Sequence, residues 1–394
     1  MMRRIALSLA AMLTALVSLC AVPDSAAVVS LLTCMPGSEI YELEGHSGLR
    51  VRIPGRADLT LNWGVFDFNS PGFVYRFVKG ETDYMAAAYP TALFLESYAR
   101  EGRAVREQVI SLTPEQTARL MALADDNLRP DHRVYRYNYI LDNCATRPLS
   151  LIERAIGDTL RFGAGPMPER AGDTFRQTMA KFHSAYPWYQ FGIDTALGTR
   201  IDRPMTRREA AFAPVILADM LAGAALPDGS PAVLSDSYIV GSADSPSVSQ
   251  GPTRAMFAPM AFGVLVLLLS AAVSAGQLYG HMLAARIFDT LWFGACFAAG
   301  LVVAFLVFIS VHEATAPNLV LLWLNPLCLA GAVAPWLKSA QRLEFCYQSV
   351  NFALLIALAA AGVCGVQNLN PAFWPLMCAS AIRAAVWLSR PRLR

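Results

Sequence analysis

The pattern of apolar positions changes near residue 256. From there onward the chain consists of long apolar runs, each close to the roughly 20 residues that cross a bilayer as a helix. The runs occupy residues 257–278, 287–310, 319–336, 350–366 and a shorter stretch at 373–388. Arg383 interrupts the last run, which could instead lie in the membrane interface. Residues 256–394 are therefore expected to form an all-α bundle of about five transmembrane helices.

The first residues have the order of a secretory signal peptide. Two arginines precede an apolar run at 5–22, and small residues follow it at 25–27. We expect residues 1–27 to be removed and the next domain to be exported. Cys20 raises the alternative of a lipoprotein signal, but Leu19 occupies the position before it, where a small residue is needed.

The loops between the apolar runs predict the orientation. If the first domain is exported, each span then reverses the side of the membrane. The segments expected in the cytoplasm contain Arg286, Lys338, Arg342, Arg390, Arg392 and Arg394. The outer loops at 311–318 and 367–372 contain neither Lys nor Arg, in agreement with the positive-inside rule. We expect a multi-pass protein of the inner (cytoplasmic) membrane with a periplasmic domain and a cytoplasmic C-terminus; four spans would leave the arginine-rich tail outside.

Residues 28–226 mix strand and helix patterns. Alternating apolar residues predict antiparallel strands at 49–53, 59–67, 103–112 and 135–139. Helices are expected at 90–100, 113–128, 144–156, 174–183 and 207–221. The second helix opens with Thr113-Pro114-Glu115-Gln116, a capping box with proline at the first helical position. The exported domain is therefore α+β, an antiparallel sheet with helices, and the Pro-, Gly- and Ser-rich residues 227–255 are expected to form a linker.

The composition narrows the possible partners. Hydrophobic residues make up 55% of the 394 residues and charged residues 16%, which is too apolar for a soluble protein. The net charge of +2 and the lack of a basic stripe with aromatics indicate no nucleic-acid partner. No Cys or His pair has metal-ligand spacing, so neither a metal nor another cofactor is expected. Only Cys34 and Cys144 lie in the exported domain, and a disulfide between them is an open alternative in an oxidising compartment.

Cys144 is the candidate nucleophile, because it lies where a strand gives way to a helix. A helix N-terminus lowers a thiol pKa from about 8.5 toward neutrality and supplies thiolate. The candidate base is His46, at the start of the first strand; His132 and His183 are competing candidates. Cysteine at a helix start facing histidine on a sheet is the papain-like arrangement, here with histidine first in the chain, as in permuted (NlpC-type) members. The alternative is a buried cysteine and a structural histidine.

The residue that orients the histidine is left open. Asn62, Asp67 and Glu44 are the candidates. Asn62 and Asp67 are preferred because both lie on the second strand, but they point to opposite faces, so only one of them can serve. Backbone N–H groups at the helix start, together with Asn143, are candidates to bind a developing oxyanion.

An unusual polar segment lies at the outer end of the second and third spans. It contains His312, Glu313 and Asn318, and Asn325 follows inside the third span. The segment is either a solvated turn or a site that holds a lipid headgroup, because polar groups near lipid are costly and tend to serve a function.

Several motifs together resemble the Lnb N-terminal periplasmic domain family. They are Gly45-His46, Trp63-Gly64, Gly80 with Tyr84, Tyr137-Asn138-Tyr139, Asp142-Asn143-Cys144-Ala145-Thr146-Arg147 and Gly192-Ile193-Asp194. The resemblance covers residues 38–222 and continues weakly at His312, Asn318 and Asn325.

The resemblance implies lipoprotein N-acylation. A fatty acyl chain would pass from a phospholipid donor to the N-terminal amine of a diacylated bacterial lipoprotein. Cys144 would be the nucleophile and His46 the base, with Tyr137, Arg147, His312 and Asn318 as substrate-binding residues. Two other functions remain open: a membrane-anchored papain-like cysteine peptidase or amidase acting on the cell wall, and a non-catalytic binding or scaffold protein.

Overall fold

The computed structural model describes residues 27–163, 173–242 and 258–389. The predicted signal peptide up to residue 26, part of the predicted linker and Arg390, Arg392 and Arg394 lie outside these described residues. By their internal contacts the residues fall into two compact units. The sheet unit contains Met1–Phe77, Glu81–Asp173 and Pro204–Gly251, and the helical unit contains Val78–Gly80, Thr174–Arg203 and Pro252–Arg394.

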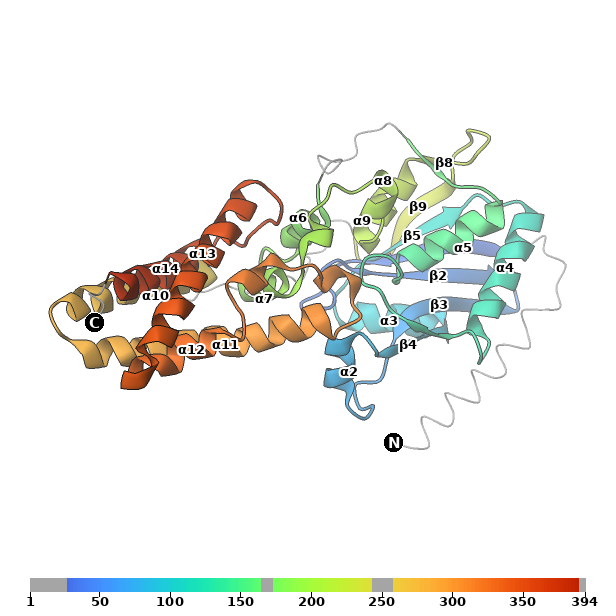
Figure 1. The fold of residues 1–394 in the computed structure, drawn as a ribbon. Helices are drawn as coiled ribbons and strands as arrows, with labels where there is room; N and C mark the ends of the chain where they lie inside the picture. Colours follow the sequence, from blue (N-terminus) through green and yellow to red (C-terminus); the bar gives the residue numbers. More distant parts are fainter. Residues whose placement is uncertain (1–26, 164–172, 243–257, 390–394) are drawn as a thin grey trace. The chain divides into compact units, whose positions relative to one another are not determined.

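The sheet unit is built on a seven-stranded antiparallel sheet in the order β6-β4-β3-β2-β1-β5-β9 (Figure 1). The strands are β1 Val28–Cys34, β2 His46–Ile53, β3 Ala57–Val65, β4 Asp83–Pro90, β5 Val105–Ile110, β6 Val134–Arg136 and β9 Val233–Val240. The predicted pairing of 49–53 with 59–67 is confirmed, since Leu49 of β2 lies opposite Leu61 of β3. A small second sheet pairs β7 Arg161–Phe162 with β8 Ala224–Ala225.

Two helices of this unit begin or end at a predicted sequence signal. They are α2 Phe73–Lys79, α3 Thr91–Arg100, α4 Pro114–Leu128, α5 Thr146–Ile156, α8 Arg207–Ala210 and α9 Pro214–Ala222. The capping box of Thr113 and Gln116 opens α4 as predicted. Gly157 ends α5 with a φ of 87°, a conformation that glycine adopts without strain. Helices α4 and α5 pack against each other beside the sheet (Figure 1).

Several parts of the sheet unit differ from the prediction, and strand β4 and helix α2 were not predicted at all. Part of the predicted linker is wrong, because Val233–Val240 forms the edge strand β9. Its polar residues resemble a linker in sequence, yet Asp236 forms an ion pair with Arg106 of β5 at 2.7 Å. The helix predicted at 207–221 is interrupted, because Pro214 begins a new helix. Strand β1 was not predicted, since its apolar run continues that of the signal peptide.

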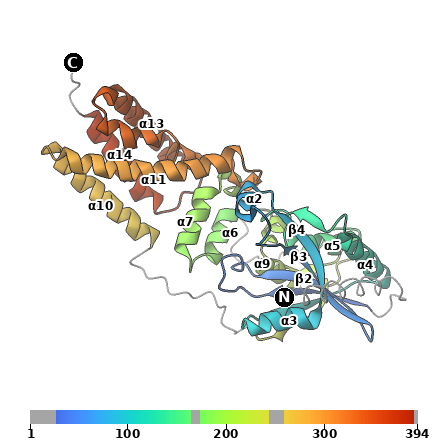
Figure 2. The same ribbon diagram turned by 90° about the horizontal axis from the view of Figure 1, so that it is seen from below.

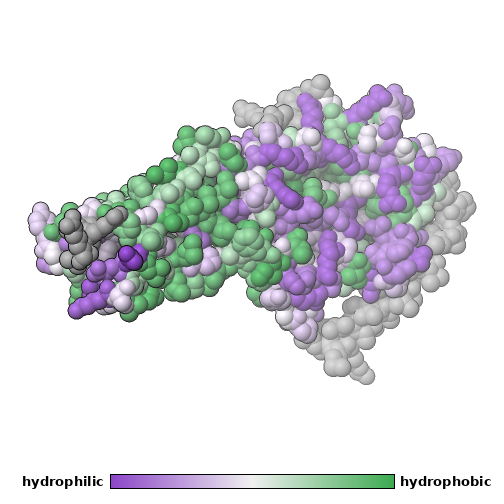
Figure 3. Space-filling view, in the orientation of Figure 1, coloured by the Kyte–Doolittle hydropathy of each residue, from purple (hydrophilic) through white to green (hydrophobic). Residues whose placement is uncertain are grey.

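The helical unit contains α10 Pro259–Leu278, α11 Met282–Phe308, α12 Cys328–Val333, α13 Gln341–Val363 and α14 Phe373–Leu388. Three segments of the described chain are long and apolar enough to cross a membrane: α10, α11 and Lys338–Val363; α14 is a shorter apolar helix. Figure 3 shows hydrophobic residues over much of this unit's surface. Their outward exposure suits contact with lipid.

The third predicted span, 319–336, is wrong as a continuous helix. It consists of the 3₁₀ turn Leu319–Leu322, helix α12 and the 3₁₀ turn Ala334–Trp336. Proline interrupts helices, and Pro326 and Pro335 lie at the two breaks. The Asn325 side chain accepts a hydrogen bond from the Leu327 N–H at 3.0 Å, which stabilises the first break.

Arg383 lies inside the helical unit rather than at an interface. Its side chain is fully buried and forms two bonds to Asp289 of α11, at 2.6 and 2.8 Å. It also donates to Ser274 and Gln277 of α10. The charge that interrupts the fifth apolar run is therefore neutralised by neighbouring helices, as buried charges require.

Residues Thr174–Arg203 pack with the membrane half of the chain. They form α6 Phe175–Phe182, α7 Pro187–Ala196 and a 3₁₀ turn, Thr199–Ile201, and α7 contacts α10 and α11 (Figure 2). Gly198 donates its N–H to the Ala314 carbonyl, and a Cβ at this position would lie 2.1 Å from the Pro317 oxygen. Only glycine permits this close approach. Asn370 also donates to Asp194, at 2.8 Å.

Candidate active site

Asn143 fixes the backbone that carries Cys144. Its side-chain oxygen accepts hydrogen bonds from the N–H groups of Ala145 and Thr146, at 2.8 and 2.9 Å. Its amide group donates to the carbonyls of Tyr139 and Phe212, at 2.7 and 2.8 Å. Both amide hydrogens are thus used, and the side chain does not have the free donor that the oxyanion prediction required. Asn143 instead holds the start of α5 in place.

His46 is the first residue of β2, and a tight turn delivers it there. Gly45 before it has a φ of 80°, and a Cβ at Gly45 would lie 2.5 Å from the Cys34 carbonyl oxygen. The Nε2 atom of His46 lies 2.6 Å from Oδ1 of Asn62 on β3. The Nδ1 atom is therefore the ring nitrogen available to the Cys144 thiol, and the two side chains shift each other's pKa.

Burial and charge act in opposite directions on this pair. Burial raises the pKa of Cys144 and lowers the pKa of His46, because it disfavours both charged forms. The mutual attraction outweighs burial: the pKa of Cys144 is lowered by His46 and by hydrogen bonds from the Ser47 backbone and Tyr137. The pKa of His46 is raised by Cys144 and by the bond to Asn62. Each charged form therefore favours the other.

The other candidate residues lie in different surroundings. Asp67 is exposed, and its carboxylate accepts the Asn69 N–H at 2.9 Å. Glu44 is buried and accepts a hydrogen bond from the Tyr139 hydroxyl. His132 is exposed and contacts Asp126 at 2.9 Å. His183 belongs to the helical unit, where its ring contacts Gln190 at 2.8 Å. Of the three orienting candidates, the structure places Asn62 against His46.

Cys34 and Cys144 are both buried, but their thiol pKa values shift in opposite directions. Both cysteines are free, so the disulfide alternative does not describe this structure. Cys34 is fully buried, and burial raises its thiol pKa far above the ordinary value. Its thiol therefore stays protonated and unreactive. Among its described residues, the sheet unit therefore has one inert cysteine, Cys34, and one whose thiol pKa is lowered, Cys144.

Aromatic residues adjoin the sulfur, and sequence reasoning gave most of them no role. The Tyr137 hydroxyl lies 3.8 Å from the Cys144 sulfur. The Tyr137 ring stacks on Tyr84, with centroids 4.7 Å apart. Gly64 makes room for Tyr137, since a Cβ there would lie 3.3 Å from its ring. Tyr84 was visible in the motif series, but only the fold brings it to this site.

Two family models match the chain. Residues 21–180 match the Lnb N-terminal periplasmic domain, and residues 252–391 match the Lnb transmembrane domain, a domain of five transmembrane helices. The chain belongs to the Lnb family. Neither the curated proteins nor the solved structures contain a match. Membership confirms the resemblance and assigns the chain to a family of lipoprotein N-acyltransferases with a periplasmic domain and membrane-spanning helices.

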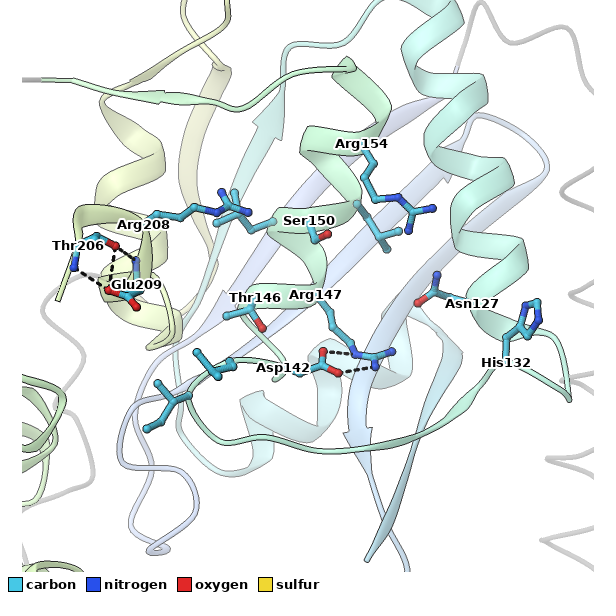
Figure 4. A pocket seen from close by; sticks show the side chains of 14 residues that line it. Asn127, His132, Asp142, Thr146, Arg147, Ser150, Arg154, Thr206, Arg208 and Glu209 are labelled. Atoms are coloured by element: carbon cyan, nitrogen blue, oxygen red, sulfur yellow. Dashed lines mark hydrogen bonds and ion pairs between the residues drawn. The ribbon is translucent and has the colours of Figure 1, made fainter. Parts of the chain in front are cut away.

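A polar pocket of about 700 Å³ lies beside α5 in this Lnb periplasmic domain (Figure 4). Arg147, Arg154, Arg208 and Asp142 are among its lining residues. Arg147 is already engaged: it forms two bonds to Asp142, at 2.6 and 2.7 Å, and its guanidinium lies 3.4 Å from the Tyr135 ring centre. Neither Cys144 nor His46 lines the pocket.

His312 and Asn318 lie in the helical unit of this Lnb-family chain, in the loop after α11. Asn318 donates to the Thr195 carbonyl at 2.9 Å and accepts from Val320 and Gln367, each at 3.0 Å. These bonds give Asn318 a structural role that the sequence did not indicate. His312 lies against Gly80, where a Cβ would approach its ring to 3.3 Å.

Proposed function

We propose that this protein is a membrane-bound thiol acyltransferase. It moves a fatty acyl chain from a phospholipid, through a thioester on Cys144, to the N-terminal amine of a diacylated lipoprotein. The observation that carries the proposal is the set of buried Cys144 and partly buried His46 and Asn62 in an Lnb periplasmic domain, with Nε2 of His46 only 2.6 Å from Asn62. Nucleophile, base and orienting residue lie in series, as nucleophilic catalysis requires.

In the first half-reaction, the Cys144 thiolate attacks the carbonyl carbon of a phospholipid acyl ester. A carbon–sulfur bond forms, and the ester carbon–oxygen bond breaks. His46, as imidazolium, donates its proton to the leaving glycerol oxygen. The bond from Nε2–H to Asn62 keeps the ring oriented throughout this step.

The developing oxyanion needs donors that are already in place. The N–H of Cys144 has no hydrogen-bond partner within the described residues and lies at the start of α5. Such a donor lowers the barrier because it needs no reorganisation when charge develops. We assign this N–H, rather than the Asn143 amide, to the oxyanion.

In the second half-reaction, the lipoprotein amine attacks the thioester. A carbon–nitrogen bond forms, the carbon–sulfur bond breaks, and neutral His46 accepts the amine proton. The cycle restores the thiolate and imidazolium and consumes no cofactor.

The membrane half supports this choice of substrates. Phospholipid acyl esters and lipoprotein N-termini both reside at the outer leaflet, so a periplasmic domain tied to transmembrane helices meets both. Five spans with a cytoplasmic C-terminus accord with the distribution of Lys and Arg. Tyr137, beside the sulfur, is the substrate-binding residue that we favour most.

Product analysis tests the proposal. Mass spectrometry of lipoprotein N-termini from cells with and without the protein should show an added amide-linked acyl chain only when the protein is present. In purified protein, phospholipid should load Cys144 with a hydroxylamine-sensitive acyl group, and Cys144→Ala should remain unloaded. Released wall peptides with unchanged lipoproteins would instead indicate a hydrolase.

A further inference from the structure

A continuous series of aromatic rings runs from the Cys144 sulfur to the exposed helix α2. We call Phe66, Phe68, Phe73, Phe77, Tyr84 and Tyr137 the aromatic strip. Beyond Tyr137, successive ring centroids are separated by 4.7 Å to Tyr84, 5.1 Å to Phe66, 5.6 Å to Phe73 and 5.8 Å to Phe77. Phe68 contacts both Phe66 and Phe73, at 4.5 and 5.1 Å. All six residues belong to the sheet unit.

The strip is half-buried near the sulfur and exposed at its far end. Tyr137, Tyr84, Phe66 and Phe73 are partly buried, whereas Phe68 and Phe77 are 60% and 48% exposed. Helix α2 has no buried residue, although its sequence is mostly apolar. Exposed apolar surface of this kind marks contact with lipid or with an apolar ligand.

The arginines beside the strip share one carboxylate. Arg76 of α2 and Arg136 of β6 both contact Asp83, at 2.7 and 3.1 Å. Both guanidinium groups are therefore engaged in ion pairs, and the rings supply the apolar surface between α2 and the sulfur.

The length of the strip suits one acyl chain. A chain in a bilayer leaflet extends over about half of the roughly 30 Å hydrocarbon core. The four centroid steps from Tyr137 to Phe77, of 4.7 to 5.8 Å each, cover a path of the same order.

We propose that the aromatic strip binds the fatty acyl chain carried by Cys144, with the chain's far end at α2. The inference rests on the proposed function and adds the location of the acyl chain. It makes the strip the part of the protein that distinguishes long from short acyl groups.

Cross-linking in the unchanged, full-length protein tests this location directly. In detergent, a p-nitrophenyl ester of a palmitoyl chain with a terminal diazirine loads Cys144: the thiolate forms a carbon–sulfur bond, and p-nitrophenolate leaves. After illumination, adducts should lie in the segment from Phe66 to Phe77. A diazirine near the middle of the chain should move them toward Tyr84. Adducts only in the helical unit, or only on other strands of the sheet, would overturn the proposal.

A chain-length comparison gives an independent test. The double variant Phe66→Ser with Phe73→Ser should lose about tenfold or more of the palmitoyl-over-butyryl preference in Cys144 loading, because apolar pockets discriminate by burying methylene groups. Butyryl loading should continue, which shows that the site is folded. Tyr41→Ser is the matched control, since Tyr41 is an exposed aromatic outside the strip. An unchanged preference in the double variant would contradict the proposal.

The outcomes separate the two levels of inference. If neither ester loads Cys144 of the unchanged protein, the acyl-enzyme itself is wrong. If both esters load Cys144 but the adducts lie outside the aromatic strip, only the proposed location of the acyl chain is wrong. If the double variant loses butyryl loading as well, the cross-linking result decides, because it needs no substitution.

Discussion

Two pairs of interacting side chains, Arg383 with Asp289 and Cys144 with His46, differ in how many other groups stabilise them. In the helical unit, Arg383 donates to Asp289, Ser274 and Gln277, and Asp289 also accepts from Trp387 at 2.8 Å. In the sheet unit, Cys144 and His46 depend mainly on each other, with a bond to Asn62 and weaker support from Tyr137.

The difference suits Arg383 and Asp289 to a structural role and Cys144 and His46 to the proposed chemistry. The charged atoms of a hydrogen-bonded buried ion pair are not available to bind a substrate. Removing one partner leaves the other charge buried without a counter-charge. A thiolate stabilised chiefly by one imidazolium keeps its nucleophilicity and has a proton donor in reach. Desolvation opposes charge at both sites. The helical unit offsets this cost with several hydrogen-bond partners for Arg383 and Asp289, and the sheet unit offsets it mainly with the attraction between Cys144 and His46.

The largest expected effect is on the thiol itself. Cys144→Ala should lower the acyl-transfer rate by a factor on the order of 10⁶, to the uncatalysed background, because the covalent route is lost. Cys34→Ala should keep nearly full activity, since Cys34 is protonated and fully buried. Transfer rates and thermal unfolding of both variants check this. Substantial turnover by Cys144→Ala would show that the Cys144–His46 pair is structural, like the Arg383–Asp289 pair.

The next effect concerns His46 and pH. His46→Ala should reduce transfer by about 10² to 10⁴. In the unchanged protein the pKa of Cys144 is lowered and that of His46 raised, so thiolate persists below the usual thiol range and is lost only as pH falls further. Iodoacetamide labelling of Cys144 should therefore start at lower pH in the unchanged protein than in His46→Ala, where burial acts alone. Identical labelling curves would show that His46 does not ionise the thiol.

Breaking the other pair should affect stability and leave the chemistry intact. Asp289→Leu leaves the Arg383 charge buried in the helical unit without its counter-charge, which should lower the free energy of unfolding by about 3–5 kcal/mol. Adding Arg383→Met should recover most of that loss, because no buried charge then remains. Thermal unfolding in detergent measures both. A single variant as stable as the unchanged protein would mean that the pair contributes nothing to the bundle.

The smallest effect separates Asn62 from Asp67. Asn62→Ala frees the His46 ring to rotate, and a misplaced base should cost up to about 10²-fold in rate. Asp67→Asn should leave the rate unchanged, because Asp67 is exposed and contacts Asn69. Equal effects of the two substitutions would contradict the assignment of Asn62.

Local signals allowed much of the fold to be predicted. The capping box fixed the start of α4, and alternation along 49–53 and 59–67 gave the pairing of β2 with β3. The Cys144 and His46 candidates also came from local context, a helix start and a strand start.

Features that depend on distant partners could not be predicted. Strand β1 has the continuous apolar pattern of a central strand, which resembles a signal peptide when read alone. The Asp236 partner of Arg106 lies 130 residues away in sequence, so β9 resembled a linker. The aromatic strip draws on β4, α2 and the loop after β6, and only the tertiary fold brings them together.

The packing of Thr174–Arg203 with the membrane half also governs the order in which the chain matures. Gln367 donates to the Leu197 carbonyl across 170 residues. At about 5–20 residues per second, the ribosome would complete Leu197 roughly 10 to 30 s before its partner emerges. Residues Thr174–Arg203 can pack against their partners only after the membrane helices are inserted, whereas the sheet strands on either side of this segment can pair earlier. Assembly of the enzyme is therefore completed by the membrane half, even though most of the catalytic machinery is synthesised first.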